Sequence, residues 1–296
     1  QNSGTFASNK TFRYSLENSG YGVREISLEH PVAEDINIIV LADMRSNFTE
    51  EEFRNFDAYL KRGGNLFILG EPKRQQFMNP VIERLGLRFA DGIIVSPSEV
   101  NLDDLVAANI KEGAAKVSEN YIRYFRSGYS IMTPSVCAVE VIDPNKGFEI
   151  TEVLASAGKG SWVEKETTDF INEKSMLNPA VGEVEKSNSI MLYLTRPVNN
   201  KEQRIFVIGD ADCISTLELS QNRPGFRSSN FTLITETFRN LSYGEFPVEA
   251  SRVNPPDDRV LVTRNVIFGI RVVLMWIIPL LFVTGCITLL IRRKRR

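Results

Sequence analysis

The apolar positions of the first 90 residues follow two alternating spacings, one typical of buried strands and one typical of helices. Apolar runs at 36–41 and 65–69 predict two strands that are covered on both faces. Between them, a capping box at 49–52 begins a helix with one apolar face. A strand, a capped helix and a second strand form a βαβ unit, so we predict that the two strands are parallel. Asn79 followed by Pro80 predicts the start of the next helix.

The alternation weakens in the middle of the chain and then returns. The two segments there with the clearest strand pattern are 131–142 and 189–194. A strand at 204–209 and a helix at 231–241 resume the earlier order, and we expect them to close the same sheet. We therefore predict that residues 1–245 form one α/β domain with a parallel sheet, in which residues 92–196 are a β-rich insertion.

An uninterrupted apolar run of 20 residues, 272–291, lies near the C-terminus. At about 1.5 Å per residue, a helix of this length spans roughly 30 Å, the thickness of the hydrocarbon core of a bilayer. The run is apolar on every side, whereas the core helix of a globular domain usually keeps a polar stripe. We predict a transmembrane helix over 266–291, preceded by a linker at 246–265. The five basic residues at 292–296 predict a cytoplasmic tail and a domain outside the cytoplasm.

The charge balance supports this topology and excludes one class of partner. Lysine and arginine number 35 against 37 aspartate and glutamate residues, a net charge of -2. Because five of the basic residues form the tail, the rest of the chain carries 30 basic and 37 acidic side chains. This balance does not favour a nucleic-acid partner. The chain begins at Gln1 without an apolar leader, so we expect either a cleaved signal peptide or an earlier membrane span upstream.

The residues that most enzymes use as nucleophile and base are scarce. His30 is the only histidine, and Cys137 and Cys213 are the only cysteines outside the apolar run. None of the usual nucleophile, phosphate-loop or zinc spacings occurs. We therefore expect no catalytic residue, no metal site and no cofactor. We interpret both cysteines as small buried hydrophobic side chains.

Acidic residues follow three of the predicted strands. They are Asp43, Glu71, Asp210 and Asp212. Since the carboxyl ends of parallel strands share one edge of a sheet, where ligands usually bind, these side chains are candidates for lining a crevice that holds a cation or a polar ligand. The structural alternative is simpler, because acidic residues in such places commonly cap a helix or close a turn.

Four motifs give the chain a resemblance to a known family. They are the run 40–72, which contains FTEEEF and LKRGGNLFILGEP, then LASAGKGSWVE at 154–164, RIFVIGDADCIS at 204–215, and PLLFVTG before the basic tail. In this order they resemble the GldG-type auxiliary extracytoplasmic component of ABC transport systems, a family associated with gliding motility in Bacteroidetes. The resemblance implies a flavodoxin-like domain of the class I glutamine-amidotransferase type that lacks the catalytic cysteine and histidine.

The resemblance also implies partners, an ABC-2 type permease and its cytoplasmic ATPase. The leading interpretation is a non-enzymatic accessory subunit, anchored in the bacterial inner membrane, whose periplasmic domain binds a ligand or a partner protein. The alternative is an exported hydrolase that uses the acidic strand ends, alone or with a metal. A third interpretation, a eukaryotic type I membrane protein, depends on glycans at four sequons. These begin at Asn9, Asn47, Asn230 and Asn240.

Overall fold

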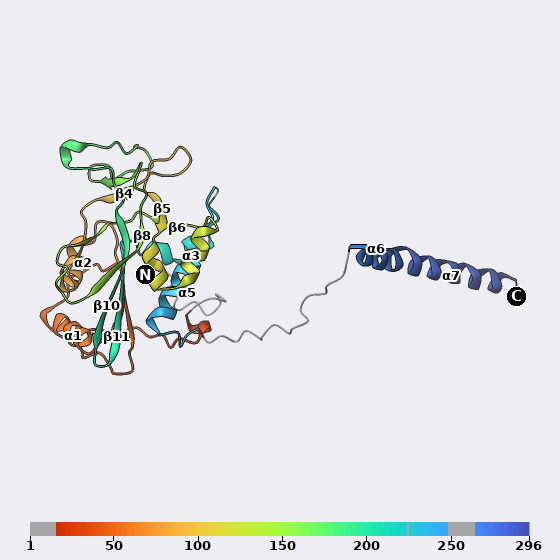
Figure 1. Cartoon of the computed structure of the whole chain (residues 1–296), viewed down its shortest axis with the longest axis horizontal. Coiled ribbons are helices and arrows are strands. Elements are labelled where there is room, and N and C mark those ends of the chain that lie inside the picture. Colours follow the sequence, from red (N-terminus) through yellow and green to blue (C-terminus); the bar gives the residue numbers. More distant parts are fainter. Residues whose placement is uncertain (1–15, 224, 248–263, 296) are drawn as a thin grey trace. The chain divides into compact units, whose positions relative to one another are not determined.

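The structure is a computed structural model that describes residues 16–223, 225–247 and 264–295. The chain divides into two compact units, residues 1–249 and residues 250–296. Most of the predicted linker at 246–265 lies outside the described residues, as does the sequon at Asn9. The helices and strands of the first unit are labelled in Figure 1.

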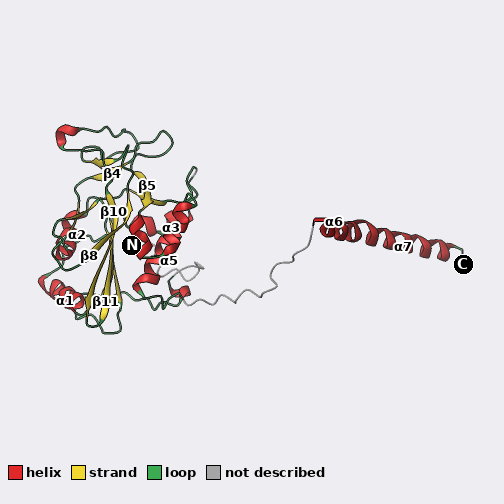
Figure 2. Ribbon diagram, viewed as in Figure 1, coloured by secondary structure: helices red, strands yellow, loops and turns green. Residues whose placement is uncertain are grey.

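A seven-stranded sheet forms the centre of the first unit (Figure 2). Its strands, in spatial order, are β1 (Ile38–Ala42), β2 (Asn65–Leu69), β11 (Lys201–Ile208), β10 (Ser189–Val198), β8 (Glu149–Ala155), β5 (Leu105–Ile110) and β6 (Ile131–Pro134). Strands β1, β2 and β11 run parallel, and every other neighbouring pair is antiparallel. The expected flavodoxin-like parallel sheet is therefore not confirmed: the sheet is mixed, and four of its strands come from the region between residues 92 and 198.

A two-residue turn explains why the sheet changes direction at β10 and β11. Asn199 and Asn200 both adopt left-handed backbone conformations, with φ values of 50° and 64°. They connect Val198 to Lys201, which face each other as the last pair of an antiparallel ladder. Two consecutive left-handed residues are the mark of the primed hairpin turns, and asparagine tolerates this conformation better than most residues. The Asn-Asn pair in the sequence therefore holds β10 antiparallel to β11.

The predicted βαβ unit is confirmed. Helix α1 (Glu50–Lys61) begins at a capping box in which the Glu52 amide donates to the Thr49 hydroxyl and the Thr49 amide donates to the Glu52 carboxylate, at 3.2 and 2.7 Å. After the helix, the chain turns at Gly63, whose φ is +88°. The backbone of Gly64 packs against the Tyr59 ring so closely that a side chain would collide with it. Strand β2 then pairs in parallel with β1.

Helix α2 (Gln75–Ile82) begins five residues earlier than predicted. Asn79 does not cap it. Instead, its side chain accepts a hydrogen bond from the Phe89 amide at 2.9 Å and donates to the Phe89 carbonyl at 3.2 Å. This pair of bonds joins α2 to the short strand β3 (Leu87–Phe89). The Asn79-Pro80 prediction was wrong because the asparagine serves a tertiary contact, which leaves Pro80 inside the helix.

Two hydrophobic cores lie on opposite faces of the sheet. In β2, Phe67 and Leu69 belong to one core, and Leu66 and Ile68 belong to the other. Helices α3 (Glu119–Arg126) and α5 (Asn230–Leu241) cover the first face, and α1 and α2 cover the second (Figure 1). Burial on both faces explains the continuous apolar run of β2, since a strand exposed on one face would alternate polar and apolar residues.

The remaining elements of the first unit are short. They are α4 (Thr216–Ser220), β4 (Ile93–Val95), β7 (Val139–Val141), β9 (Trp162–Glu164) and five 3₁₀ turns, at Glu17–Ser19, Glu83–Leu85, Glu112–Lys116, Pro179–Val181 and Asp212–Ile214. Strand β3 pairs with β7, and β4 pairs with β9. The second pair, together with the loops 96–104 and 165–187, forms what we call the β4–β9 lobe, which has its own small core.

The second unit contains a long apolar helix. It is formed by α6 (Arg264–Val272), a π-helical turn at Val273–Ile277 and α7 (Ile278–Lys294). Of the described helices, this one alone is long and apolar enough to cross a membrane, over Val266–Lys294. Its position agrees with the span predicted from the sequence.

Candidate ligand-binding site at the carboxyl ends of the parallel strands

Three of the four predicted acidic residues line one depression. Asp43 follows β1, Glu71 follows β2, and Asp212 lies just beyond β11. The depression has a volume of about 300 Å³, and its other lining residues are Arg45, Pro72, Lys73 and Arg74. Asp210, the fourth predicted residue, is fully buried and does not line it. The parallel alignment of β1, β2 and β11 is what brings these three carboxyl groups to one edge.

Asp43 is held by two arginines at the rim of the depression. Arg45 Nη2 lies 2.6 Å from Asp43 Oδ2, and Arg74 Nε lies 3.4 Å from Asp43 Oδ1. The backbone of Asp43 is left-handed, with a φ of 42°, and so is that of Lys73, with a φ of 66°. Both conformations are uncommon outside glycine and asparagine. The charge of Asp43 is thus largely compensated within the chain.

Glu71 is half-buried and has an unusual titration. Burial, followed by the charges of Asp212 and Asp43, raises its pKa to about 8. The Ala211 amide donates a hydrogen bond to its carboxylate, which opposes this rise but does not cancel it. At neutral pH most Glu71 side chains are therefore protonated and able to donate a hydrogen bond.

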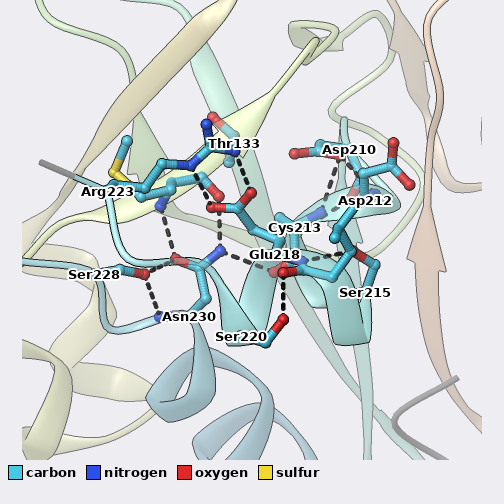
Figure 3. A network of polar contacts seen from close by, with 12 residues as sticks. Thr133, Asp210, Asp212, Cys213, Ser215, Glu218, Ser220, Arg223, Ser228 and Asn230 are labelled. Carbon is cyan, nitrogen blue, oxygen red and sulfur yellow. Dashed lines mark hydrogen bonds and ion pairs between the residues drawn. The ribbon is translucent and has the colours of Figure 1, made fainter. Parts of the chain in front are cut away.

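Asp210 closes the turn that follows β11 (Figure 3). Its Oδ1 accepts hydrogen bonds from the amides of Asp212 and Cys213, at 2.7 and 3.2 Å. This is the role that the structural alternative predicts for an acidic residue after a strand. Its Oδ2 is buried and has no hydrogen-bond partner among the described residues. Burial and the nearby Glu71 raise the pKa of Asp210, so this carboxyl group also favours its protonated form.

The two cysteines near this edge are free thiols in the core. Cys137 and Cys213 are both buried and do not form a disulfide with each other. Burial raises the pKa of each thiol, which makes both poor nucleophiles. The Cys137 amide donates to the Gly209 carbonyl at 2.9 Å, so this cysteine helps to pack the end of β11. Their interpretation as small buried hydrophobic side chains is confirmed.

A polar network that the sequence pattern does not indicate lies beside the Asp210–Cys213 turn (Figure 3). Asn230, at the start of α5, donates to the carbonyls of Met132 and Cys213 at 2.7 and 2.8 Å and accepts from the Met132 amide at 2.8 Å. Glu218 forms a short ion pair with Arg223, at 2.5 Å. Asn230 is 1% exposed, so its sequon is closed to glycosylation in the folded chain.

No metal centre is formed in the part of the chain that the structure describes. Nowhere in residues 16–223, 225–247 and 264–295 do three histidine, cysteine or acidic side chains group as metal ligands do. Asp43, Glu71 and Asp212 share the depression, but arginines occupy the carboxylate of Asp43. The arrangement is suited to a polar ligand that forms hydrogen bonds and ion pairs.

The family of the chain follows from its sequence as a whole. A model of the family described as an ABC-type uncharacterized transport system, an auxiliary component, matches residues 2–242. The chain belongs to this family. The match covers the whole sheet and the depression, and the apolar helix of this ABC-transport auxiliary component lies beyond it. No curated protein has a sequence that matches the chain.

The chain has a low similarity to two solved structures. The mmIFT52 N-terminal domain has a TM-score of 0.48 and 16% identity, covering 71% of this chain and 78% of its own. A ThuA-like protein from Parabacteroides merdae ATCC 43184 has a TM-score of 0.36 and 13% identity, covering 72% of this chain and 86% of its own.

Proposed function

We propose that the chain is a membrane-anchored, non-enzymatic accessory subunit of a bacterial ABC-2 type transporter, which works with a permease and a cytoplasmic ATPase. The observation that carries the proposal is the family match over residues 2–242, followed by a candidate membrane helix. The basic tail after that helix supports an inner-membrane location with the domain in the periplasm. The motif resemblance supports a GldG-type subunit and a link to gliding motility.

The depression at the strand ends is the proposed ligand site. Two arginines share the single negative charge of Asp43, so one of their positive charges is not balanced, and Glu71 is mostly protonated. The charges left for a ligand are therefore this guanidinium charge and those of Lys73 and Asp212. Neither Lys73 nor Asp212 has an ion-pair partner of opposite charge among the described residues. Two positive charges and one negative charge at the same rim favour a small polar ligand that carries at least one anionic group, with Glu71 as a hydrogen-bond donor.

The β4–β9 lobe supplies the proposed surface for the permease. Val100, Ile171 and Met176 are each 79–80% exposed, and Leu102 and Val184 are about half exposed. Lys174 holds the two loops together, because its Nζ donates to the Ser98 carbonyl at 2.8 Å and lies 3.3 Å from the Asp103 carboxylate. Large aliphatic side chains exposed on the two loops of one lobe are candidates for a protein contact.

The test of the function is purification of the full chain from its native membrane in mild detergent, with mass spectrometry of the chains that accompany it. We expect an ABC permease and an ATPase to co-purify with the chain in stoichiometric amounts. A chain that comes alone, under conditions that keep other membrane complexes intact, would contradict the accessory role. The matched control is the chain with its apolar helix replaced by that of an unrelated single-span protein, which keeps membrane anchoring but removes contacts specific to the helix.

One observation favours the alternative, an exported hydrolase. A carboxyl group with a pKa of about 8 beside a second acidic residue is the arrangement that general acid catalysis uses. A hydrolase would lose activity on both Glu71→Gln and Asp212→Asn while still purifying alone. An accessory subunit would keep its partners in the Glu71→Gln variant and show no hydrolysis of ester, amide or glycoside substrates before or after the change.

A further inference from the structure

A basic and aromatic surface lies at the C-terminal end of α3 and shares no residue with the depression or the β4–β9 lobe. We call it the α3 surface. Its residues are Arg123, Tyr124, Phe125, Arg126, Tyr129 and Arg227. The first five lie in or just after α3, and Arg227 lies in the loop before α5.

Direct contacts join these residues into one surface. The rings of Tyr124 and Tyr129 meet edge to face, with centroids 5.3 Å apart. The guanidinium group of Arg227 lies 4.9 Å from the centre of the Tyr129 ring, and its Nη1 donates to the Ser127 carbonyl at 3.1 Å. The Ser130 amide also donates to the Arg227 carbonyl at 2.9 Å, which fixes the loop beside the helix.

The opposite side of α3 is anchored in the core. The Tyr121 hydroxyl donates to the Leu233 carbonyl at 2.8 Å and lies 3.0 Å from the Thr237 hydroxyl, both on α5. The side-chain Nδ2 of Asn120 donates to the Glu236 carboxylate at 2.9 Å. Because these bonds fix which side of the helix faces inward, the arginines and Phe125 are held outward on a rigid element.

The positive charges on this surface are not paired with carboxylates in the described part of the chain. Among those residues, none of Arg123, Arg126 and Arg227 lies within 4.0 Å of a carboxylate. All three are exposed, and the Phe125 side chain is 43% exposed beside them. The surface is therefore a positive and aromatic patch on a domain that is acidic overall.

We propose that the α3 surface binds the anionic headgroups of the membrane in which the chain is anchored. Arginine, tyrosine and phenylalanine suit the headgroup region, where charged or polar tips meet lipid phosphates and the rings reach the acyl boundary. The chain also has the means to bring this surface to a bilayer. Sixteen residues, 248–263, separate the domain from the candidate membrane helix, a length that spans at most about 55 Å when extended.

Tethering makes a weak contact sufficient. A domain held within a few tens of ångströms of a bilayer meets it at a high effective concentration, so three basic residues and one aromatic residue can hold it there without a deep lipid pocket. Each basic residue near an anionic membrane raises the equilibrium constant for membrane contact roughly fivefold, and three together raise it about a hundredfold.

The test uses the full chain in lipid nanodiscs and reports contact with headgroups directly. A bimane label is attached to the Ser127→Cys variant, with Cys286→Ser removing the exposed thiol of the membrane helix, and the discs carry a nitroxide quencher on the lipid headgroup. We expect strong quenching in discs that contain phosphatidylglycerol and little in discs of phosphatidylcholine alone. We expect about 0.5 M NaCl to remove most of the quenching, because it screens exposed charges.

Two variants and a matched control separate the lipid contact from other causes. Arg123→Gln, Arg126→Gln and Arg227→Gln together are expected to abolish the quenching, and Phe125→Ser alone to reduce it. The control removes three exposed lysines from other elements, by Lys61→Gln, Lys159→Gln and Lys186→Gln, and is expected to keep it. Circular dichroism confirms that each variant is folded.

Three results would overturn the proposal. They are equal quenching in neutral and anionic discs, quenching that survives the arginine changes, and quenching that depends on an added permease rather than on anionic lipid. The Phe125→Ser variant keeps the test valid if the triple variant does not fold, because it changes neither the charge nor the arginine contacts with the loop.

Discussion

Arg74, in the loop after β2, forms an ion pair with Asp43, in the loop after β1, with Arg74 Nε 3.4 Å from Asp43 Oδ1. The pair joins the carboxyl ends of two parallel strands at the rim of the depression. Since both side chains are partly exposed, the pair contributes little stability, about 0.5 kcal/mol. Its effect is to hold the loops in place and to neutralise one of the acidic groups.

The left-handed backbone of Asp43 provides a test of this role. Asparagine tolerates a φ of 42° and alanine does not, so Asp43→Asn removes the charge alone, whereas Asp43→Ala also adds backbone strain. We expect Asp43→Asn to lower the free energy of unfolding by less than about 1 kcal/mol and Asp43→Ala to lower it by about 1 kcal/mol more. Thermal unfolding of the two variants in detergent checks the order. Equal losses would show that strain at this residue is negligible.

Because the pKa of Glu71 is raised, we expect the free energy of unfolding to fall as the pH rises. Its pKa in the folded chain is about 8, against an ordinary value of 4.5, so between these values the folded chain binds the proton more tightly than the unfolded chain does. The stabilisation that comes from binding this proton is fully present below pH 4.5 and is lost as the pH rises through 8. Allowing for solvent screening, we expect a loss of about 2 kcal/mol.

Glu71→Gln removes this titration and keeps the hydrogen-bond donor. We therefore expect the melting temperature of the wild type to fall between pH 5 and pH 8, and that of Glu71→Gln to fall by less. A residual fall is expected because the pKa of Asp210 is raised too. Parallel pH dependence of the two proteins would contradict the assignment of the proton to Glu71. Glu166→Gln, a change at an exposed glutamate of the β4–β9 lobe, serves as the control.

Substitutions on the β4–β9 lobe are expected to change permease binding without changing the stability of the chain. Because Val100 and Met176 are 80% and 79% exposed, Val100→Glu and Met176→Glu together are expected to leave the melting temperature unchanged. They are also expected to reduce the yield of co-purified permease severalfold, since a charge in an apolar contact is costly to desolvate. Leu217→Glu, at a side chain 70% exposed on α4, is the matched control and is expected to keep the permease. An unchanged yield in the double variant would move the contact elsewhere.

Local features of the fold were readable from the sequence, and the pairing of distant strands was not. The capping box at Thr49 and the buried run of β2 depend on neighbours in the chain, so their patterns were sufficient. The order of β10, β8, β5 and β6 depends on pairings across tens of residues, which periodicity does not encode. The Asn199-Asn200 turn is a local signal for the antiparallel pairing of β10 with β11, but the spacing of apolar residues does not include it.

In the candidate site too, some features could be predicted from the sequence and others could not. Parallel strands share one edge, so the convergence of Asp43, Glu71 and Asp212 could be anticipated. The burial of Asp210 could not, because the end of β11 packs against a segment distant in the sequence, where the Cys137 amide donates to the Gly209 carbonyl. Nor could the sequence show that Arg74 would pair with Asp43, since the two residues are 31 positions apart.

A substitution at Gly209 tests how much the site depends on the close packing of Gly209 against the Cys137 backbone. A Cβ atom on Gly209 would lie 1.9 Å from the Cys137 carbonyl oxygen, a collision with backbone that no side-chain movement relieves. We expect Gly209→Ala to lower the free energy of unfolding by about 3 kcal/mol and to disturb the turn that Asp210 closes. Gly158→Ala is the matched control, because its Cβ would meet only the Ser187 Cβ, at 4.0 Å. Urea unfolding of both variants, with reactivity of Cys213 as a second readout, would show whether β11 and Cys137 must pack backbone to backbone. If Gly209→Ala were as stable as Gly158→Ala and kept Cys213 unreactive, the end of β11 would be more adaptable than its packing indicates.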